Sequence, residues 1–134
     1  MLDTDIASYV IRGRFPNLDA RLRENDPTTL CVSAVTRAEL RYGVARRASA
    51  RGLAGQVQLF LDGILSVSWD DSAADRYGSL RAQLENQGTP IGNLDTMIAA
   101  HALAIGAILV TNNERHFGLV NGLAVENWFA GAAD

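Results

Sequence analysis

Hydrophobic residues recur along the chain in two alternating patterns. Short apolar or alternating runs are typical of strands that lie inside a fold, and longer stretches with apolar residues three or four positions apart are typical of helices. Turn signals such as Asn25-Asp26-Pro27 separate the two kinds of segment. Strands are predicted at positions 1–3, 30–33, 64–69, 107–110 and 123–125. Helices are predicted at positions 6–12, around 21–23, and at 36–45, 52–62, 71–85 and 93–105.

The alternation of strands and helices predicts βαβ units, and therefore an α/β fold with a mostly parallel sheet between layers of helices. We expect the crossovers to be right-handed. The chain has 134 residues, which fits a single domain over positions 1–134. In such a fold the functional groups are expected in the crevice outside the carboxyl ends of the strands.

Composition narrows the class of protein without naming a function. Hydrophobic residues make up 48% of the chain and charged residues 20%, which is typical of a globular domain. No apolar run is long enough to cross a membrane, and the first residues lack the pattern of a secretory signal. The lone cysteine, Cys31, has no partner for an internal disulfide. We therefore expect a cytoplasmic protein that does not enter a membrane.

The charge distribution leaves two interpretations open. The net charge of −3 does not suggest a nucleic-acid-binding protein, because phosphate binding usually requires a basic surface. All twelve basic residues are nevertheless arginine, and five of them lie within positions 37–51. Arginine pairs bidentately with phosphate. Taken alone, positions 37–51 favour a solvated helix face over a phosphate-binding patch.

Three acidic residues from distant parts of the chain are expected at one edge of the sheet. Asp3 ends the first predicted strand, and Glu39 and Asp95 lie in the first turns of two predicted helices. Each acid also has a local explanation. Asp3 can cap a helix, Glu39 can form a capping box with Thr36, and Asp95 can favour the positive end of its helix dipole.

Taken together, the three acids suggest a metal site. Carboxylates that converge on one small region repel each other unless a cation neutralises them. Hard oxygen ligands suit Mg²⁺ or Mn²⁺. A cation of this kind serves phosphoryl chemistry, because it polarises the phosphorus–oxygen bond, lowers the pKa of a bound water and aligns the attack.

Four motifs, in order over nearly the whole chain, resemble those of VapC-type PIN-domain toxins. Positions 2–5 (LDTD) resemble the opening LDTN or LDTD of that family. Positions 33–43 (SAVTRAELRYG) resemble its helix start, and positions 90–102 (PIGNLDTMIAAHA) resemble its P-I-G-x-x-D segment. Positions 109–128 resemble the closing pattern of VTNN, F, GL and E-x-W. The chain departs from the family in having only two residues before its first acid.

The resemblance implies a PIN fold, which is a three-layer α/β/α sandwich, and a homodimer. It implies an endoribonuclease toxin that depends on Mg²⁺, with Mn²⁺ as a substitute, and that inhibits translation and growth. It also implies a cognate VapB-type antitoxin as partner. The Thr-Asn-Asn version of the last motif is typical of a subgroup similar to the enteric toxins that cut initiator tRNA in the anticodon loop. We therefore expect tRNA as the RNA substrate.

The resemblance also assigns roles to residues. Asp3, Glu39 and Asp95 match the three core acids of the family and are expected to hold the metal. The fourth acidic position of many PIN domains falls on Asn113, an amide that can orient a water or substrate but brings no charge. A second tightly bound metal is therefore in question.

Other residues are expected to support the reaction. Arginines are expected to contact flanking phosphates, and polar side chains to position the substrate, a water or the acids. Arg37 and Arg41 are the arginines, and Asn112 and Thr111 are the residues expected to position substrate or water. Asp5 and Ser33, and again Thr111, are expected to contact the acids or bound waters. Local roles compete: Asp5 can be a helix N-cap, and the two strand-end hydroxyls can satisfy nearby backbone groups. His101 is interpreted as a packing residue and His116 as an exposed loop residue.

Two rival functions are weighed against the nuclease. Asp3-Thr4-Asp5 after a strand also looks like the start of a haloacid-dehalogenase-type phosphatase, but that class and receiver domains need a lysine, and the chain has none. The second rival is a PIN-fold module that binds RNA or antitoxin without cutting, which the amide at Asn113 keeps open. The stretch from Tyr42 to Phe60 is either an antitoxin-binding groove or ordinary packing of two helices.

Overall fold

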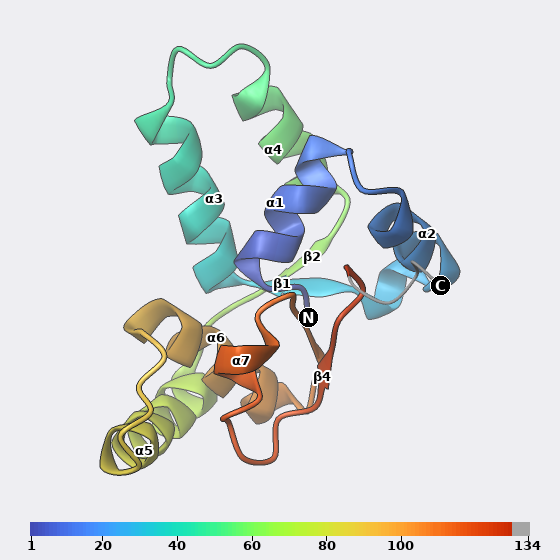
Figure 1. Cartoon of the computed structure of the whole chain (residues 1–134). Helices are drawn as coiled ribbons and strands as arrows, with labels where there is room; N and C mark the ends of the chain where they lie inside the picture. The colour runs from blue at the N-terminus through green and yellow to red at the C-terminus, as the bar shows by residue number, and fades with distance from the viewer. Residues whose placement is uncertain (130–134) are drawn as a thin grey trace.

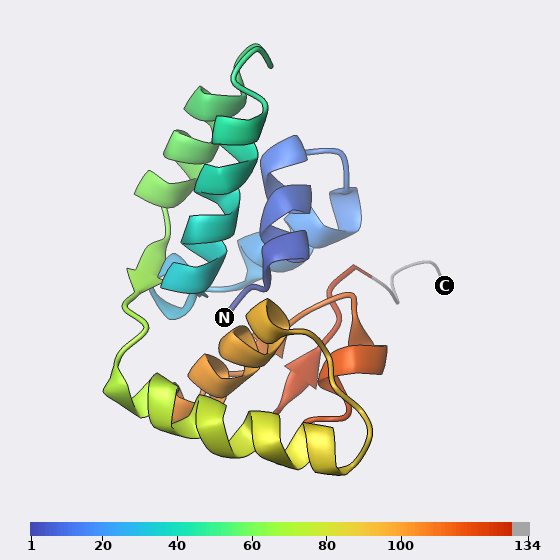
Figure 2. The same cartoon turned by 90° about the vertical axis from the view of Figure 1, so that its left-hand side faces the viewer.

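A computed structural model of the protein, describing residues 1–129, has a parallel sheet between two layers of helices (Figures 1 and 2). The strands are β1 (Cys31–Ser33), β2 (Leu65–Val67), β3 (Leu109–Val110) and β4 (Val125–Glu126). The helices are α1 (Thr4–Arg12), α2 (Pro16–Glu24), α3 (Ala34–Arg46), α4 (Leu53–Asp62), α5 (Asp71–Asn86), α6 (Asn93–Ile105) and α7 (Glu114–Phe117), and a 3-10 helix spans Pro27–Thr29. The predicted α/β class and the parallel sheet are confirmed.

The first residues of the chain lie in the middle of this sheet. Leu2 forms parallel bridges to Val32 of β1 on one side and to Val110 of β3 on the other. The backbone N–H of Leu2 donates to the carbonyl of Cys31 at 2.9 Å, and that of Asp3 donates to the carbonyl of Val110 at 3.0 Å. Since β1 pairs with β2 and β3 pairs with β4, the order across the sheet is β2, β1, Leu2, β3, β4, with every pairing parallel.

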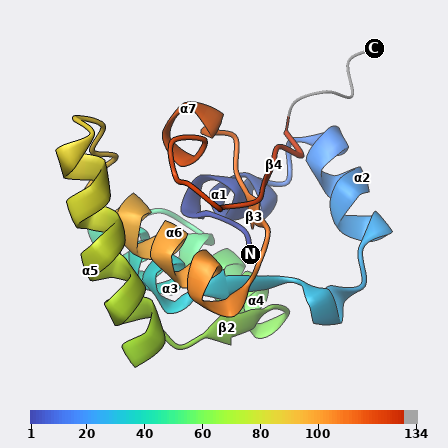
Figure 3. The ribbon, with the colours of Figure 1, turned by 90° about the horizontal axis from the view of Figure 1, so that it is seen from below.

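Both faces of the sheet are covered, so successive residues of a strand enter different cores. Val32, Val110 and Leu2 pack with helices α1 to α4 on one face. Cys31 and Leu109, their strand neighbours, pack with helices α5 and α6 on the other face, where the two helices lie side by side (Figure 3). Burial on both faces holds for the inner strands β1 and β3, whose residues are all buried, whereas the outer strands β2 and β4 are partly exposed.

The start of α3 differs from the prediction. The helix begins at Ala34, with Ser33 as its N-cap, and the Ser33 hydroxyl accepts a hydrogen bond from the N–H of Val35 at 3.1 Å. The predicted start at Thr36 is therefore wrong, and Thr36 does not form the expected capping box with Glu39. Glu39 lies in the second turn of the helix instead of the first.

Several other bounds agree with the prediction, but α2 begins at Pro16, earlier than predicted, and β3 begins at Leu109 and not at Ala107. Helix α7 and the 3-10 helix at Pro27–Thr29 were not predicted. Helix α6 begins and ends where expected, and Asp70 caps α5 by accepting from the N–H of Ala73. Strand β2 is shorter than the predicted 64–69. Strand β4 begins two residues later than predicted, because Leu109 pairs in register with Val125. No helix within residues 1–129 combines the length and apolarity needed to span a bilayer.

Replacing Leu2 by alanine tests the central position of the first segment. Leu2 has no exposed surface, so Leu2→Ala removes apolar contacts and leaves a cavity between β1 and β3. We expect a loss of about 2–5 kcal/mol in the free energy of unfolding, measured by urea denaturation. Leu59→Ala is the matched control: its side chain is 76% exposed, and the expected change is within about 0.5 kcal/mol. Equal losses in the two variants would contradict this arrangement.

Candidate active site

Asp3 is the most buried acid of the site, with 4% of its surface exposed. It follows Leu2 directly and caps α1, because its Oδ1 accepts from the N–H of Ile6 at 2.8 Å. Its Oδ2 accepts a short hydrogen bond from the hydroxyl of Thr111, the residue that follows β3. The two bonds hold the carboxylate between the first segment and β3. The Thr111 hydroxyl also accepts a hydrogen bond from the N–H of Asn113 at 2.9 Å, so it contacts an acid and satisfies local backbone at once, and both alternatives for this residue hold. Its contact with substrate stays a prediction.

Glu39 reaches the site from the second turn of α3. Its Oε1 accepts from the hydroxyl of Thr4 at 2.7 Å, and the hydroxyl oxygens of Thr4 and Thr36 lie 3.1 Å apart. Because Thr4 is the first residue of α1, these bonds fix the ends of α1 and α3 against each other. Thr4 has no role in the sequence-based expectation, although it stands inside the first motif.

Asp95 lies in the first turn of α6, as predicted. Its Oδ2 is 3.8 Å from Nδ1 of His116, a residue of α7. The amide nitrogen of Asn113 is 3.0 Å from the same ring nitrogen, so His116 stands between the amide and the acid. His116 is exposed, as expected, but the prediction that it lies in a loop is wrong, because it belongs to α7. Its place beside Asp95 was missed, because no sequence pattern pairs the two residues.

Burial and neighbouring charges raise the pKa values of the three acids. Burial raises the pKa of Asp3 to about 6, with further increases from the charges of Asp5 and Asp95, against the lowering effect of the bonds from Thr111 and Ile6. The pKa of Glu39 is raised by burial and then by the charges of Asp95 and Asp5. The pKa of Asp95 is raised by burial and then by the charge of Asp5. Asp3, Glu39 and Asp95, which we call the acid rim, therefore lie in a region where negative charge is unfavourable.

The donor chemistry of the rim fits a hard cation. All the candidate ligands are carboxylate oxygens, and their raised pKa values show that negative charge is unfavourable there unless it is compensated. Within residues 1–129 no three acidic, histidine or cysteine side chains are close enough to form a ready metal cage. Mg²⁺ does not need one, because it usually keeps several waters and uses one or two carboxylates.

The structure places the other predicted residues in different surroundings. Arg37 points to the hydroxyl of Ser66, with Nη1 3.5 Å from it, and Nη2 of Arg41 donates to Oε1 of Gln58 at 2.8 Å. The amide oxygen of Asn112 accepts from Asn127 at 3.1 Å. Their contacts with substrate stay predictions.

The two predicted supporting residues also differ from each other. Asp5 is exposed in the first turn of α1, and the alternative of an N-cap at Asp5 is wrong because Asp3 is the cap. Ser33 is buried and serves backbone and core: besides capping α3, its Oγ lies 2.7 Å from Nδ1 of the buried His101.

Comparisons with known proteins agree with this geometry. The family model described as PIN domain matches residues 1–122. The chain is similar to a protein of Shigella flexneri named tRNA(fMet)-specific endonuclease VapC, with 38% identity over 128 residues and 96% of each chain covered. It is also similar to ribonuclease VapC2 of Rickettsia felis, with 36% identity over 132 residues and the same coverage.

Solved structures show the same fold. The chain matches VapBC of Salmonella typhimurium in a DNA-bound crystal structure with a TM-score of 0.90 and 34% identity, over 96% of each chain. It matches VapBC2 of Rickettsia felis, bound to a DNA fragment from its promoter, with a TM-score of 0.88 and 34% identity, over 96% of this chain and 97% of that one. The expected PIN fold is therefore confirmed.

The raised pKa of Asp3 predicts a gain in stability when its charge is removed. Between about pH 4 and pH 6 the folded state binds more protons than the unfolded state, so the free energy of unfolding falls as pH rises through this window. In EDTA, Asp3→Asn should be about 1–3 kcal/mol more stable than the parent protein at pH 7, with no gain at pH 4. Urea denaturation at both pH values measures this, and an equal or lower stability of the variant at pH 7 would contradict it.

Proposed function

Because the chain belongs to the PIN-domain family, among the VapC ribonucleases of toxin–antitoxin systems, we propose that it is a Mg²⁺-dependent endoribonuclease toxin that cleaves tRNA. The observation that carries the proposal is the group of Asp3, Glu39 and Asp95 at the carboxyl ends of the strands, whose pKa values are raised by burial and by the charges of Asp5 and Asp95. Family, position and charge all support the same chemistry. The single PIN domain over residues 1–134 is part of this proposal.

The proposed roles follow from the contacts at the rim. Asp3, Glu39 and Asp95 would hold the cation, and the cation would supply Lewis acidity at the scissile phosphate and lower the pKa of a water. Thr111 and Thr4 keep Asp3 and Glu39 in place through their hydroxyl bonds. Asn113 orients substrate or water at the edge of the site. Mn²⁺ is expected to substitute, because it prefers the same oxygen ligands.

A tRNA substrate is supported by the names of two relatives. The proteins of Shigella flexneri and Salmonella typhimurium are named tRNA(fMet)-specific endonucleases, and they are 38% and 34% identical to this chain. The chain shares the Thr-Asn-Asn motif on which this expectation rests. We propose cleavage in the anticodon loop of initiator tRNA, which would stop translation and growth and would take place in the cytoplasm.

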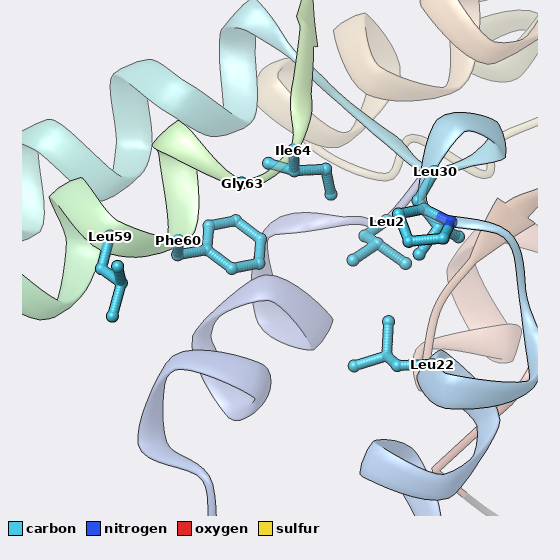
Figure 4. A pocket seen from close by; sticks show the side chains of 8 residues that line it. Leu2, Leu22, Leu30, Leu59, Phe60, Gly63 and Ile64 are labelled. Atoms are coloured by element: carbon cyan, nitrogen blue, oxygen red, sulfur yellow. The ribbon is translucent and has the colours of Figure 1, made fainter.

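A VapB-type antitoxin is the proposed partner, and an apolar groove offers a surface for it. The groove has a volume of about 250 Å³ and lies between α2 and α4, with Leu22, Leu59 and Phe60 in its wall (Figure 4). Matching solved structures contain toxin and antitoxin together, as in VapBC of Salmonella typhimurium. An amphipathic antitoxin helix would bury this groove. The homodimer implied by the family resemblance also belongs to the proposal, and light scattering measures it.

The rival function is a PIN-fold module that binds RNA or antitoxin without cutting. Asn113 is the specific observation that favours it, because an amide replaces the fourth carboxylate of many PIN domains. Metal-dependent cutting of RNA distinguishes the two functions, because only the endoribonuclease would show it.

Removing the charge of Asp95 should abolish cleavage. Purified protein freed of antitoxin is incubated with total tRNA in Mg²⁺, in Mn²⁺ or in EDTA, and the fragments are sequenced. We expect discrete fragments with either metal, none in EDTA, and at least a ~100-fold lower rate for Asp95→Asn, because a charge-bearing ligand is lost. Asp75→Asn, on the exposed face of α5, is the control and should cut normally. Cutting by Asp95→Asn at the parent rate would exclude the metal mechanism.

Antitoxin binding should depend on the apolar groove and not on the acids. Leu59→Arg places a charge in the groove and should weaken binding of the cognate antitoxin at least ~10-fold in calorimetry, while tRNA cleavage stays unchanged. Leu119→Arg, at an exposed apolar residue 41% accessible outside this groove, should bind the antitoxin normally. If both variants bind with parent affinity, the antitoxin docks elsewhere.

A further inference from the structure

A second groove begins at the acid rim itself. It has a volume of about 220 Å³ and lies between α1, α3 and α4, which stand side by side on one face of the sheet (Figures 1 and 2). Thr4 and Glu39 line it at the rim, and Arg12, Arg46 and Arg47 also line it. The groove is distinct from the apolar one between α2 and α4, because the two share no lining residue.

One face of α3 supplies much of this groove. Glu39, Gly43 and Arg46 follow each other at intervals of four and three residues, which places them along the same side of the helix. Arg46 is seven residues beyond Glu39, about 10 Å along the helix axis. That distance corresponds to about three steps of a stacked nucleic-acid strand. Arg37 and Arg41 lie on another face and do not line the groove.

Within residues 1–129 Arg12, Arg46 and Arg47 have no acidic partner. Arg12 lies over the ring of Tyr9 and Arg46 over the ring of Tyr42, each with its guanidinium carbon 5.9 Å from the ring centre. In the described part of the chain none of Arg12, Arg46 and Arg47 forms an ion pair with a carboxylate. A guanidinium that rests on a ring keeps its hydrogen-bond donors available for a ligand.

The local charge is opposite in sign to that of the whole protein. The hairpin of α3 and α4, positions 34–62, contains five arginines and two acids, Glu39 and Asp62, which gives a net charge of +3, whereas the whole chain has −3. An anionic ligand is therefore attracted to this helical hairpin although the protein is acidic overall. The floor of the groove is apolar, with Leu40, Val44 and Val57 between the charged walls.

We propose that this groove binds the RNA strand on one side of the cleavage point, with Arg12, Arg46 and Arg47 contacting backbone phosphates and the apolar floor receiving a base. The inference rests on the proposed ribonuclease function and deepens it. A strand whose scissile phosphate lies at the acids must leave the rim along some surface. This groove adjoins Glu39 and carries unpaired arginines, so its chemistry matches phosphates a few nucleotides from the cut.

The test measures RNA binding separately from cutting. In an Asp95→Asn background, the arginines are replaced by glutamine singly and together, and the affinity for tRNA is measured by fluorescence anisotropy from ~50 to ~300 mM salt. Each lost phosphate contact should reduce the slope of log K against log salt by about 0.7–0.9. We expect each single variant to bind several-fold more weakly and the triple variant at least ~30-fold more weakly. Arg76→Gln, on the exposed surface of α5, should bind like the background protein.

Two further measurements separate charge from folding and RNA from protein. The triple arginine-to-lysine variant keeps the charges and should retain most of the salt slope, and thermal unfolding shows whether the triple glutamine variant is folded. Parent-like affinity and slope in a folded triple glutamine variant would overturn the proposal. So would a loss of antitoxin binding with RNA binding intact, because the groove would then be a protein site. Failure of the parent protein to cut RNA would instead overturn the nuclease function.

Discussion

The site depends on the insertion of three residues, Met1 to Asp3, between β1 and β3. Leu2 bridges both neighbouring strands, and its side chain is fully buried in the core beneath α1 to α4. Asp3 then leaves the sheet at its carboxyl edge, where a bond from Thr111 and a bond from Ile6 hold the carboxylate. Without this insertion the two halves of the sheet would not join, and the most buried acid would have no fixed position.

Burial of the three carboxyl groups at the acid rim opposes their ionisation. Asp3, Glu39 and Asp95 are partly removed from water and share the field of Asp5, so each is less readily ionised than a free carboxyl group. The apolar contacts on the two faces of the sheet offset the unfavourable free energy of burying these acids. The proposed cation would offset this unfavourable interaction, because a positive charge favours the ionised form of neighbouring carboxyl groups.

The sequence was sufficient for the fold class and for the positions of Asp3 at the end of the first segment and Asp95 in the first turn of α6, because both follow from local order. A residue at the end of a strand and a residue early in the next helix lie at the same edge of a parallel sheet. The start of α3 was misplaced because Ser33 and Thr36 are both good caps, and only the end of β1 decides between them. Partners chosen by packing, such as Thr4 with Glu39 and His116 with Asp95, leave no pattern in the sequence. The orientation of the arginines is equally invisible, since it depends on how α3 is turned against α1 and α4.

The bond between Thr111 and Asp3 joins residues separated by 108 positions, and the Leu2 bridge to Val110 spans the same length. During synthesis the beginning of the chain therefore leaves the ribosome long before its neighbouring strand exists. The acid-bearing edge is completed only when nearly the whole polypeptide has emerged. The acid-bearing edge that the proposed ribonuclease activity requires is therefore incomplete until Thr111 has been synthesised.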